Sequence, residues 1–263
     1  MGTDTGGITV TSVGNAGFLV RSGDAAILVD ALYRDGVEGY DAIPGERRAL
    51  LEEALPPFDG VDLLLVTHLH ADHFDPEAVG RHLIANPAAR LVTTRQAAGS
   101  LASAFIGYEE VKDRVIQVAP AAGTIIPVRG AGESAAIHVR VIDLPHGSVE
   151  NIGFLVDMGG LRLLHVGDTE VTADAYARLG LEREAIDVTF LPYWNLVYEQ
   201  WQGVPEAIGA ETLVVMHLPL AGGPAEDAAS TGGREAMIAG IRARHPGAVV
   251  LEEPMTSASI EAP

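Results

Sequence analysis

The stretch Thr67-His68-Leu69-His70-Ala71-Asp72-His73 carries the strongest chemical signal in this chain. It follows residues 61–66, a continuous apolar run that is typical of a buried strand. His68 and His70 stand two positions apart at the end of this extended run, so their side chains are expected on the same side of the chain. Two imidazoles that face one point indicate a metal site.

Asp72 and His73 come next, where the chain must turn toward a helix. Asp75 is predicted as the N-cap of that helix, with a proline in its first turn, and the helix is predicted to run to about residue 84. The turn lets Asp72 and His73 face a second point near the first. Four nitrogen and oxygen donors between residues 68 and 73 are enough to begin two metal sites.

Three further candidate ligands repeat one placement, because each follows the carboxyl end of an expected strand. They are His146 after residues 137–143, Asp168 after residues 161–165 and His217 after residues 212–216. Sheets of α/β proteins bring ligand-binding residues together at this edge, so distant positions can converge there. Burying imidazoles and carboxylates unpaired is costly, and metal binding removes that cost.

Short apolar, β-branched runs alternate with helical segments, which predicts a layered α/β architecture. Residues 8–13, 18–21 and 26–29 are separated by turn residues and are expected to form consecutive antiparallel strands. Further strands are predicted at 61–66, 90–93, 115–118, 137–143, 153–158, 161–165, 188–191, 212–216 and 248–251. Helices are predicted at 76–84, 95–105, 172–179 and 233–244, with an amphipathic segment at 46–54. Residues 221–233 are expected to form a mobile loop and residues 256–263 a frayed tail.

The composition of the 263 residues excludes several classes of protein. Hydrophobic residues make up 48% of the chain, and we expect a single domain over residues 1–263. Cysteine is absent, which excludes disulfides, thiolate ligands and a cysteine nucleophile. Acidic residues outnumber basic ones 36 to 17, the formal charge is −19, and Lys112 is the only lysine. This charge repels polyanions, so no nucleic-acid partner is expected, although a metal pair would still admit a small anion.

Neither a membrane span nor a secretory signal is predicted. No uninterrupted apolar run reaches about 18 residues, and residues 1–7 lack the basic start and apolar stretch of a signal. We therefore expect a cytoplasmic protein that acts on a small molecule without a membrane partner. A signal removed from the chain would leave no trace in it.

The ordered set of donors resembles the metallo-β-lactamase superfamily of metal-dependent hydrolases, and the resemblance extends from the hairpin region of residues 14–30 to His217. It implies an α/β fold, a four-layer αβ/βα sandwich with two face-to-face sheets and helices outside. It also implies the ligands: His68, His70 and His146 for a first metal, Asp72, His73 and His217 for a second, and Asp168 as a bridge between both.

Within the superfamily, Val13-Gly14-Asn15-Ala16-Gly17-Phe18-Leu19 followed by Ile27-Leu28-Val29-Asp30 resembles the branch that contains L-ascorbate-6-phosphate lactonase. That branch commonly has histidine where this chain has Asn15, which argues against transferring the lactonase's substrate. True β-lactamases generally lack an aspartate like Asp168, and several use a cysteine ligand that this chain cannot supply. Antibiotic hydrolysis is therefore not expected as the native role.

The resemblance implies a binuclear hydrolase. Two divalent cations that share a water lower its pKa from about 15.7 toward about 7, and the resulting hydroxide would be the nucleophile. Asp72 is the expected catalytic residue, which would orient the hydroxide and pass its proton to the leaving group. Such ligands suit Zn²⁺ best, and Mn²⁺ or Fe²⁺ would be accommodated. The expected substrate is a small ester-like molecule, such as a lactone, thioester, amide or phosphoester.

Three other functions stay open at this point. A mononuclear iron oxygenase resembling persulfide dioxygenases would use His68, His146 and Asp168, and the presence of His73 and His217 argues against it. A non-catalytic sensor would keep the site for ligand recognition. Nucleic-acid processing resembling ribonuclease Z is disfavoured by the acidic charge and the single lysine.

Residues around the expected metals have candidate roles of their own. Asp30 ends an apolar strand and is the first candidate to accept a hydrogen bond from a metal-bound histidine, with capping of the next turn as the alternative. A substrate wall is expected after the strand at 188–191, made of Tyr193, Trp194, Asn195, Tyr198 and Trp201. Packing in a core or in a homo-oligomer interface is the alternative. His82 on an exposed helix face, His138 and His245 need no function. His165 lies three residues before Asp168, and its expected role is structural, with support of the metal site as the alternative.

Overall fold

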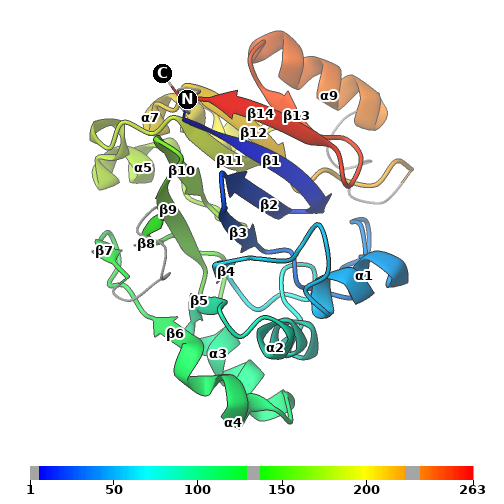
Figure 1. Cartoon of the computed structure of the whole chain (residues 1–263). Helices are drawn as coiled ribbons and strands as arrows, with labels where there is room; N and C mark the ends of the chain where they lie inside the picture. The colour runs from blue at the N-terminus through cyan, green and yellow to red at the C-terminus, as the bar shows by residue number, and fades with distance from the viewer. Residues whose placement is uncertain (1–5, 129–136, 223–231, 263) are drawn as a thin grey trace, which may run out of the picture.

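Apolar, β-branched runs form two sheets, each with seven strands in the part of the chain that the computed structural model describes, residues 6–128, 137–222 and 232–262. The two sheets lie face to face, and helices cover their outer sides (Figure 1). This arrangement confirms the predicted four-layer αβ/βα sandwich.

The first sheet has the strand order β14-β1-β2-β3-β4-β5-β6. Its strands are β1 Gly7–Gly14, β2 Gly17–Ser22, β3 Ala25–Val29, β4 Leu63–Val66, β5 Arg90–Thr94, β6 Val115–Val118 and β14 Ser257–Glu261. Strands β14, β1, β2 and β3 pair antiparallel, whereas β3, β4, β5 and β6 pair parallel. The predicted opening strands are therefore observed as consecutive antiparallel strands.

The second sheet has the order β13-β12-β11-β10-β9-β8-β7. Its strands are β7 Ile125–Pro127, β8 Ile137–Asp143, β9 Ile152–Met158, β10 Leu161–His165, β11 Val188–Pro192, β12 Thr212–Met216 and β13 Val249–Val250. Strands β7 to β10 pair antiparallel and β10 to β13 pair parallel. Both sheets thus have an antiparallel part and a parallel part, and the parallel strands end at a common edge.

Helices cover the outer faces of both sheets (Figure 1). The helices on the side of the first sheet are α1 Gly45–Glu52, α2 Pro76–Ala85, α3 Arg95–Ala104, α4 Tyr108–Val111 and the 3₁₀ turn Lys112–Arg114. Those on the side of the second are α5 Ala173–Leu179, α6 Trp194–Val197, α7 Val204–Ile208, α9 Gly233–Arg244 and the 3₁₀ turns Leu181–Arg183 and Glu199–Trp201. Among the described residues, no helix is both long and apolar enough to cross a membrane.

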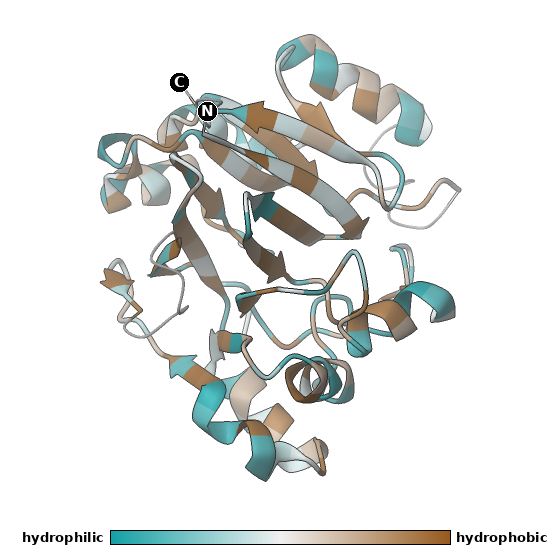
Figure 2. Ribbon diagram, in the orientation of Figure 1, coloured by the Kyte–Doolittle hydropathy of each residue, from teal (hydrophilic) through white to brown (hydrophobic). Residues whose placement is uncertain are grey.

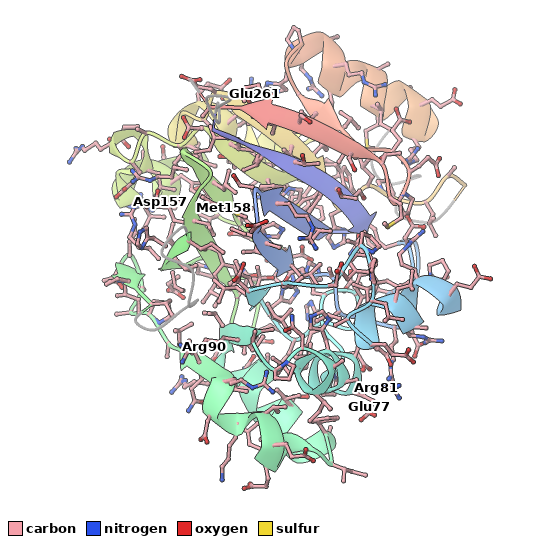
Figure 3. The ribbon with its side chains drawn as sticks, in the orientation of Figure 1. Glu77, Arg81, Arg90, Asp157, Met158 and Glu261 are labelled. Carbon is pink, nitrogen blue, oxygen red and sulfur yellow. The ribbon has the colours of Figure 1, made fainter. Side chains whose placement is uncertain are left out.

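The main hydrophobic core lies between the sheets. The rings of Phe18 in β2 and Phe190 in β11 are both buried, with centroids 4.9 Å apart. Figure 2 shows the strands as largely hydrophobic and the outer helices as mixed. Charged side chains such as Glu77 and Arg81 project outward from α2 (Figure 3). Burial of the apolar strand faces is the main stabilising contribution, at roughly 1.5–3 kcal/mol for each large side chain.

The predicted frayed tail is wrong over most of its length, because Ser257–Glu261 forms strand β14. This strand pairs antiparallel with β1, with Gly7 opposite Glu261 and Thr11 opposite Ser257. Its short polar side chains give little hydrophobic pattern, and its stability comes from backbone hydrogen bonds to a strand about 250 residues earlier in the chain. The predicted mobile loop lies mostly outside the described residues, at positions 223–231.

The expected exposure of His82 is also wrong. His82 lies on α2 and is fully buried, and its Nδ1 donates a hydrogen bond to the carbonyl oxygen of Leu51 at 2.6 Å. Burial lowers the pKa of His82 to about 4, so the imidazole is neutral at physiological pH. A helical projection of residues 76–84 alone places His82 on the solvent side, but in the structure helix α1 packs over this face of α2.

Candidate metal centre

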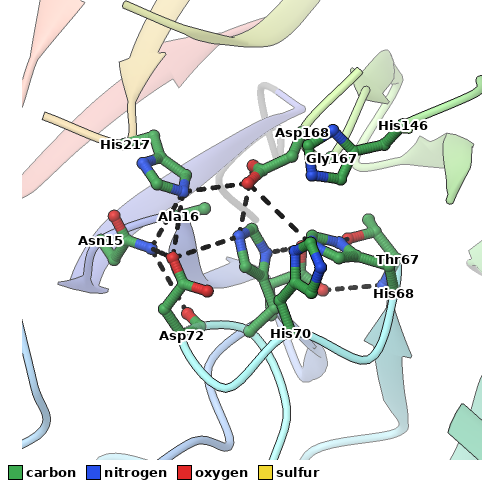
Figure 4. A network of polar contacts seen from close by, with 12 residues as sticks. Asn15, Ala16, Thr67, His68, His70, Asp72, His146, Gly167, Asp168 and His217 are labelled. Atoms are coloured by element: carbon green, nitrogen blue, oxygen red, sulfur yellow. Dashed lines mark hydrogen bonds and ion pairs between the residues drawn. The ribbon is translucent and has the colours of Figure 1, made fainter. Parts of the chain in front are cut away.

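All seven predicted ligands lie just past the carboxyl ends of strands, and the structure brings them together between the two sheets (Figure 4). Strand β4 of the first sheet leads into the loop that carries His68, His70, Asp72 and His73. The second sheet supplies the others: His146 after β8, Asp168 after β10 and His217 after β12. The site is therefore built by both sheets.

The loop after β4 is a tight turn that leads into α2. The backbone N–H groups of His73 and Phe74 both donate to the carbonyl oxygen of His70, at 3.0 and 2.9 Å. Asp75 then caps α2 by accepting a hydrogen bond from the N–H of Ala78 at 2.8 Å. These local bonds fix the direction in which the candidate ligands of the turn, Asp72 and His73, face.

The backbone around the site is held in uncommon conformations. Among the described residues, six non-glycine residues have a positive φ, and three of them lie here: Asn15 at 46°, Asp30 at 45° and His217 at 59°. Left-handed backbone costs about 1–2 kcal/mol for most residues with a side chain and less for Asn, Asp and His, which adopt it most often, and such conformations concentrate at functional sites. Long-range packing therefore maintains these three positions.

The first group of candidate ligands consists of His68, His70, His146 and Asp168, whose ligand atoms lie within 4.8 Å of one another. Nε2 of His68 is 3.1 Å from Nδ1 of His70 and 3.9 Å from Oδ2 of Asp168. Burial lowers the pKa of both His68 and His70, and the neighbouring histidines lower it further. The imidazoles of His68 and His70 are therefore neutral, which is the state that binds a metal.

The second group consists of Asp72, His73, Asp168 and His217, all of them buried. Nε2 of His217 is 3.2 Å from Oδ2 of Asp72 and 3.1 Å from Oδ2 of Asp168. Asp168 belongs to both groups. The structure thus offers two adjacent sites that share one carboxylate.

The carboxylates and imidazoles of the second group stabilise each other's charge. Burial alone would lower the pKa of His73 and His217, but Asp168 raises both, aided by Asp30 at His73. Burial would likewise raise the pKa of Asp72, yet its hydrogen bond with His217 and the charge of His73 lower it to about 2. The pKa of Asp168 also falls well below its ordinary value, because these histidines outweigh its burial.

The donor set fits divalent cations. Nε2 of His73 and Oδ1 of Asp168 lie 3.2 Å apart as an ion pair, yet neither atom has a hydrogen-bond partner of proper geometry. Buried polar atoms are rarely left unpaired, and a cation between the donors would satisfy both. Imidazole and carboxylate together suit zinc, manganese or iron.

Asp30 contacts the site from behind. Its Oδ2 accepts from Nδ1 of His73 at 2.9 Å and from Oγ1 of Thr67 at 2.6 Å, while Oδ1 accepts from the N–H of Thr67 at 2.8 Å. Asp30 therefore holds the ring of His73 with Nε2 turned toward the other donors. This is the hydrogen bond to a candidate ligand that is expected of Asp30, which directly follows β3.

Asn15, the departure from the resembling branch, also touches the second group. Its Nδ2 donates to Oδ2 of Asp72 at 2.9 Å and lies 3.3 Å from Nε2 of His217. Its backbone oxygen accepts from the N–H of His217 at 3.2 Å. Asn15 thus orients Asp72 and His217 from the turn between β1 and β2.

A cavity of about 340 Å³ opens over both groups. Of the expected wall residues, Tyr193, Trp194, Tyr198 and Trp201 line it. Asn195 does not, which corrects the prediction: it is buried on α6 and lines a neighbouring cavity. Successive residues of a helix are turned by about 100°, so Asn195 faces a different side from its neighbour Trp194.

Three lining residues were missed: Val37, Tyr40 and Glu170. Val37 and Tyr40 belong to the long loop after β3, whose path no local pattern predicts. The ring of Tyr40 lies 4.2 Å from that of His217, edge to face. Glu170 follows Asp168 by two residues, and this nearness to a predicted ligand was the available signal.

The fold, the family match and the curated relatives together define a class of protein, the metal-dependent hydrolases built on the metallo-β-lactamase fold. A family model described as the beta-lactamase superfamily domain matches residues 26–238, and the chain belongs to this family. The predicted superfamily is therefore confirmed.

Curated relatives agree with this assignment. The chain is 27% identical over 221 residues to a UPF0173 metal-dependent hydrolase of Rubrobacter xylanophilus, covering 81% of this chain and 82% of that protein. It is 28% identical over 168 residues to a UPF0173 metal-dependent hydrolase of Aeropyrum pernix, covering 63% of each, slightly less than two thirds of that relative. These relatives support the predicted metal-dependent hydrolase.

Solved structures share the fold across almost the whole chain. Igni18, a metallo hydrolase of Ignicoccus hospitalis, is similar with a TM-score of 0.64 and 16% identity, covering 97% of this chain and 99% of that one. CmlA, a diiron β-hydroxylase of Streptomyces venezuelae, has a TM-score of 0.60 and 16% identity, covering 99% of this chain and 55% of that one. At this identity the likeness establishes the fold alone.

Proposed function

We propose that this protein is a binuclear metal-dependent hydrolase of a small ester-like substrate. The observation that carries the proposal is the pair of adjacent four-residue ligand groups that share Asp168. His68, His70 and His146 would bind one divalent cation, Asp72, His73 and His217 the other, and Asp168 both. Zn²⁺ is the expected metal, and the donors also accept Mn²⁺ or Fe²⁺.

A bound metal pair supplies a nucleophilic hydroxide at neutral pH and Lewis acidity toward the bond to be hydrolysed. Asp72 lines the cavity and is ionised at neutral pH, since its pKa is about 2. At this pKa Asp72 is a weak base, so its main contribution would be to orient the attacking group by accepting a hydrogen bond. Asn15 and His217 hold Oδ2 of Asp72 in place for that role.

The substrate would enter through the cavity. Tyr193, Trp194, Tyr198 and Trp201 form one of its walls and would position the non-reacting part of the substrate. Burial raises the pKa of Tyr193, and its hydrogen bonds with Tyr40 and Tyr198 raise it further, so the phenol of Tyr193 stays uncharged at physiological pH. A site of about 340 Å³ suits a small molecule such as a lactone, thioester, amide or phosphoester.

An iron oxygenase is the second candidate. His68, His146 and Asp168, the residues of a mononuclear iron site, lie in one ligand group. A protein of the same fold, CmlA, is a diiron β-hydroxylase. Iron as the sole bound metal together with substrate-dependent oxygen uptake would favour this candidate over hydrolysis.

Metal analysis joined to a broad panel of hydrolase substrates tests the proposal. Two metals per chain and hydrolysis of at least one ester-like substrate are expected. His70→Ala should lower both the metal content and the activity, whereas His138→Ala, which changes an exposed histidine of β8, should change neither. Fewer than one metal per chain after reconstitution, with no hydrolysis across the panel, would refute the proposal.

A further inference from the structure

The walls of the cavity over the metal centre have an unusual composition. Five aromatic side chains line it, those of Tyr40, Tyr193, Trp194, Tyr198 and Trp201. Four of them form a continuous chain of rings, with centroid distances of 5.4 Å for Tyr193 and Trp194, 6.3 Å for Tyr193 and Tyr198, and 5.9 Å for Tyr198 and Trp201. The described lining contains neither lysine nor arginine.

The charge that the lining does contain is negative. Apart from the candidate ligands, Glu170 is the charged side chain in the described lining. Its carboxylate is 54% exposed and lies 3.9 Å from Nδ1 of His146, too far for a hydrogen bond. Glu170 therefore has capacity left for a ligand in the cavity.

A metal pair would not make the cavity strongly positive. Two divalent cations carry four positive charges. The carboxylates of Asp72 and Asp168 in the ligand set, and of Asp30 behind it, carry three negative charges and leave a net charge of one positive. Glu170 offsets the remaining charge at the rim. The formal charge of −19 for the whole chain attracts cations toward the cavity and repels anions.

We propose that the substrate carries an organic cation, an amine or quaternary ammonium group, beside the bond that is hydrolysed. The aromatic walls would contact its methyl or methylene groups and Glu170 would face its charge. This inference rests on the proposed function and specifies its substrate class. Aromatic faces attract cations by about 0.5–2 kcal/mol, which corresponds to a gain of roughly 2- to 30-fold over a neutral group of the same shape. A phosphorylated or carboxylated substrate would meet no cationic side chain in the described lining.

Intrinsic fluorescence gives a direct readout of binding, since both tryptophans of the chain line this cavity. Two probes of nearly the same shape separate charge from size: choline and its neutral isostere 3,3-dimethylbutan-1-ol. In titrations of the metal-loaded protein, choline should bind at least about 2-fold more tightly than the neutral alcohol. Equal or tighter binding of the neutral alcohol would overturn the proposal.

A charge-neutral variant sharpens the test. Glu170→Gln should weaken choline binding several-fold and leave the neutral alcohol unaffected. Glu199→Gln removes the same charge from a residue that lines the neighbouring cavity and should leave both affinities unchanged. If the two variants behave alike, Glu170 has no part in recognition and the proposal fails.

The outcome is independent of hydrolysis. Selective choline binding by a protein that holds two metals and hydrolyses nothing would refute the proposed function but not the cation preference. Hydrolysis of neutral or anionic esters in preference to matched cationic esters would retain the proposed function and overturn the cation preference.

Discussion

A single buried carboxylate, Asp30, joins the fold to the candidate metal centre. It directly follows β3, has a left-handed backbone and contacts both His73 and Thr67. Carboxylates behind metal-bound histidines set the ring orientation and raise the basicity of the ligand. Asp30 is therefore expected to act through His73 and not on the substrate.

Replacing Asp30 by asparagine should weaken metal binding by about 10- to 100-fold, since the amide cannot supply the negative charge behind His73. Competition with a chelator measures the affinity. Asp24→Asn, at an exposed position, is the matched control and should bind metal like the parent protein. An unchanged affinity in Asp30→Asn would show that the contact with His73 is merely structural.

His82 links stability to pH at the level of one residue. Its pKa is about 4 in the folded protein, against about 6.5 in an unfolded chain. A depressed histidine pKa means that the unfolded state binds more protons between these values, so this contribution is present above pH 6.5 and is lost as the pH falls toward 4. The loss amounts to about 3 kcal/mol.

Urea unfolding between pH 4.5 and 7 measures this contribution. His82→Gln keeps a hydrogen-bond donor and removes the titrating group, so its free energy of unfolding should fall less steeply with acid than that of the parent. His138→Gln, at an exposed position of β8, is the control and should retain the parent slope. Identical slopes for all three proteins would contradict the assignment.

At the scale of elements, the connection after β10 positions the shared ligand. Gly167 has a φ of 62°, and a Cβ there would collide with Oδ1 of Asn151 and with the side chain of Thr67. Asn151 in turn donates to the carbonyl oxygens of Leu144 and Val166, and so ties the ends of β8 and β10 together. The approach of β10 to this network determines where Asp168 lies.

Gly167→Ala should destabilise the protein by more than about 3 kcal/mol, because backbone strain and a collision add together. Gly60→Ala is the matched control, since Gly60 also has a left-handed φ, of 63°, but has open space around it. It should cost only about 1–2 kcal/mol. Thermal or urea unfolding of both variants tests the difference, and equal losses would contradict the predicted collision.

At the scale of the whole molecule, protons and metal ions compete for the histidines and aspartates at the junction of the two sheets. The raised pKa of His73 and His217 stabilises the metal-free fold fully below about pH 6.5, and this contribution is lost as the pH rises through their folded values. The lowered pKa of Asp72 and Asp168 acts oppositely, with stability present above about pH 4 and lost in acid. Cations that replace the protons should stabilise more as the pH rises.

Melting temperatures between pH 5 and 9, with zinc and with chelator, test this competition. The difference between the zinc-loaded and the chelated protein should widen with rising pH. A difference independent of pH would mean that these histidines are not protonated in the absence of metal, or that metal binds elsewhere.

The local pattern of the sequence by itself determined the layered α/β class, most strand and helix positions and the candidate ligands, and the family resemblance carried by these ligands implied the four-layer sandwich. His217 directly follows a strongly apolar strand and His68 follows another by two residues, and a ligand just past a strand end can be identified without knowing its partners. The confirmed family follows from the same ordered set.

Only the tertiary structure decided the features that depend on contacts between distant segments. Strand β14 exists because β1 offers it a free edge, and His82 is buried because α1 covers it. Tyr40 lines the cavity because the loop after β3 carries it there, whereas Asn195 lies on a side of α6 that does not line this cavity. Backbone pairing and side-chain burial at these positions are energies shared between segments far apart in the chain, so no local pattern encodes them.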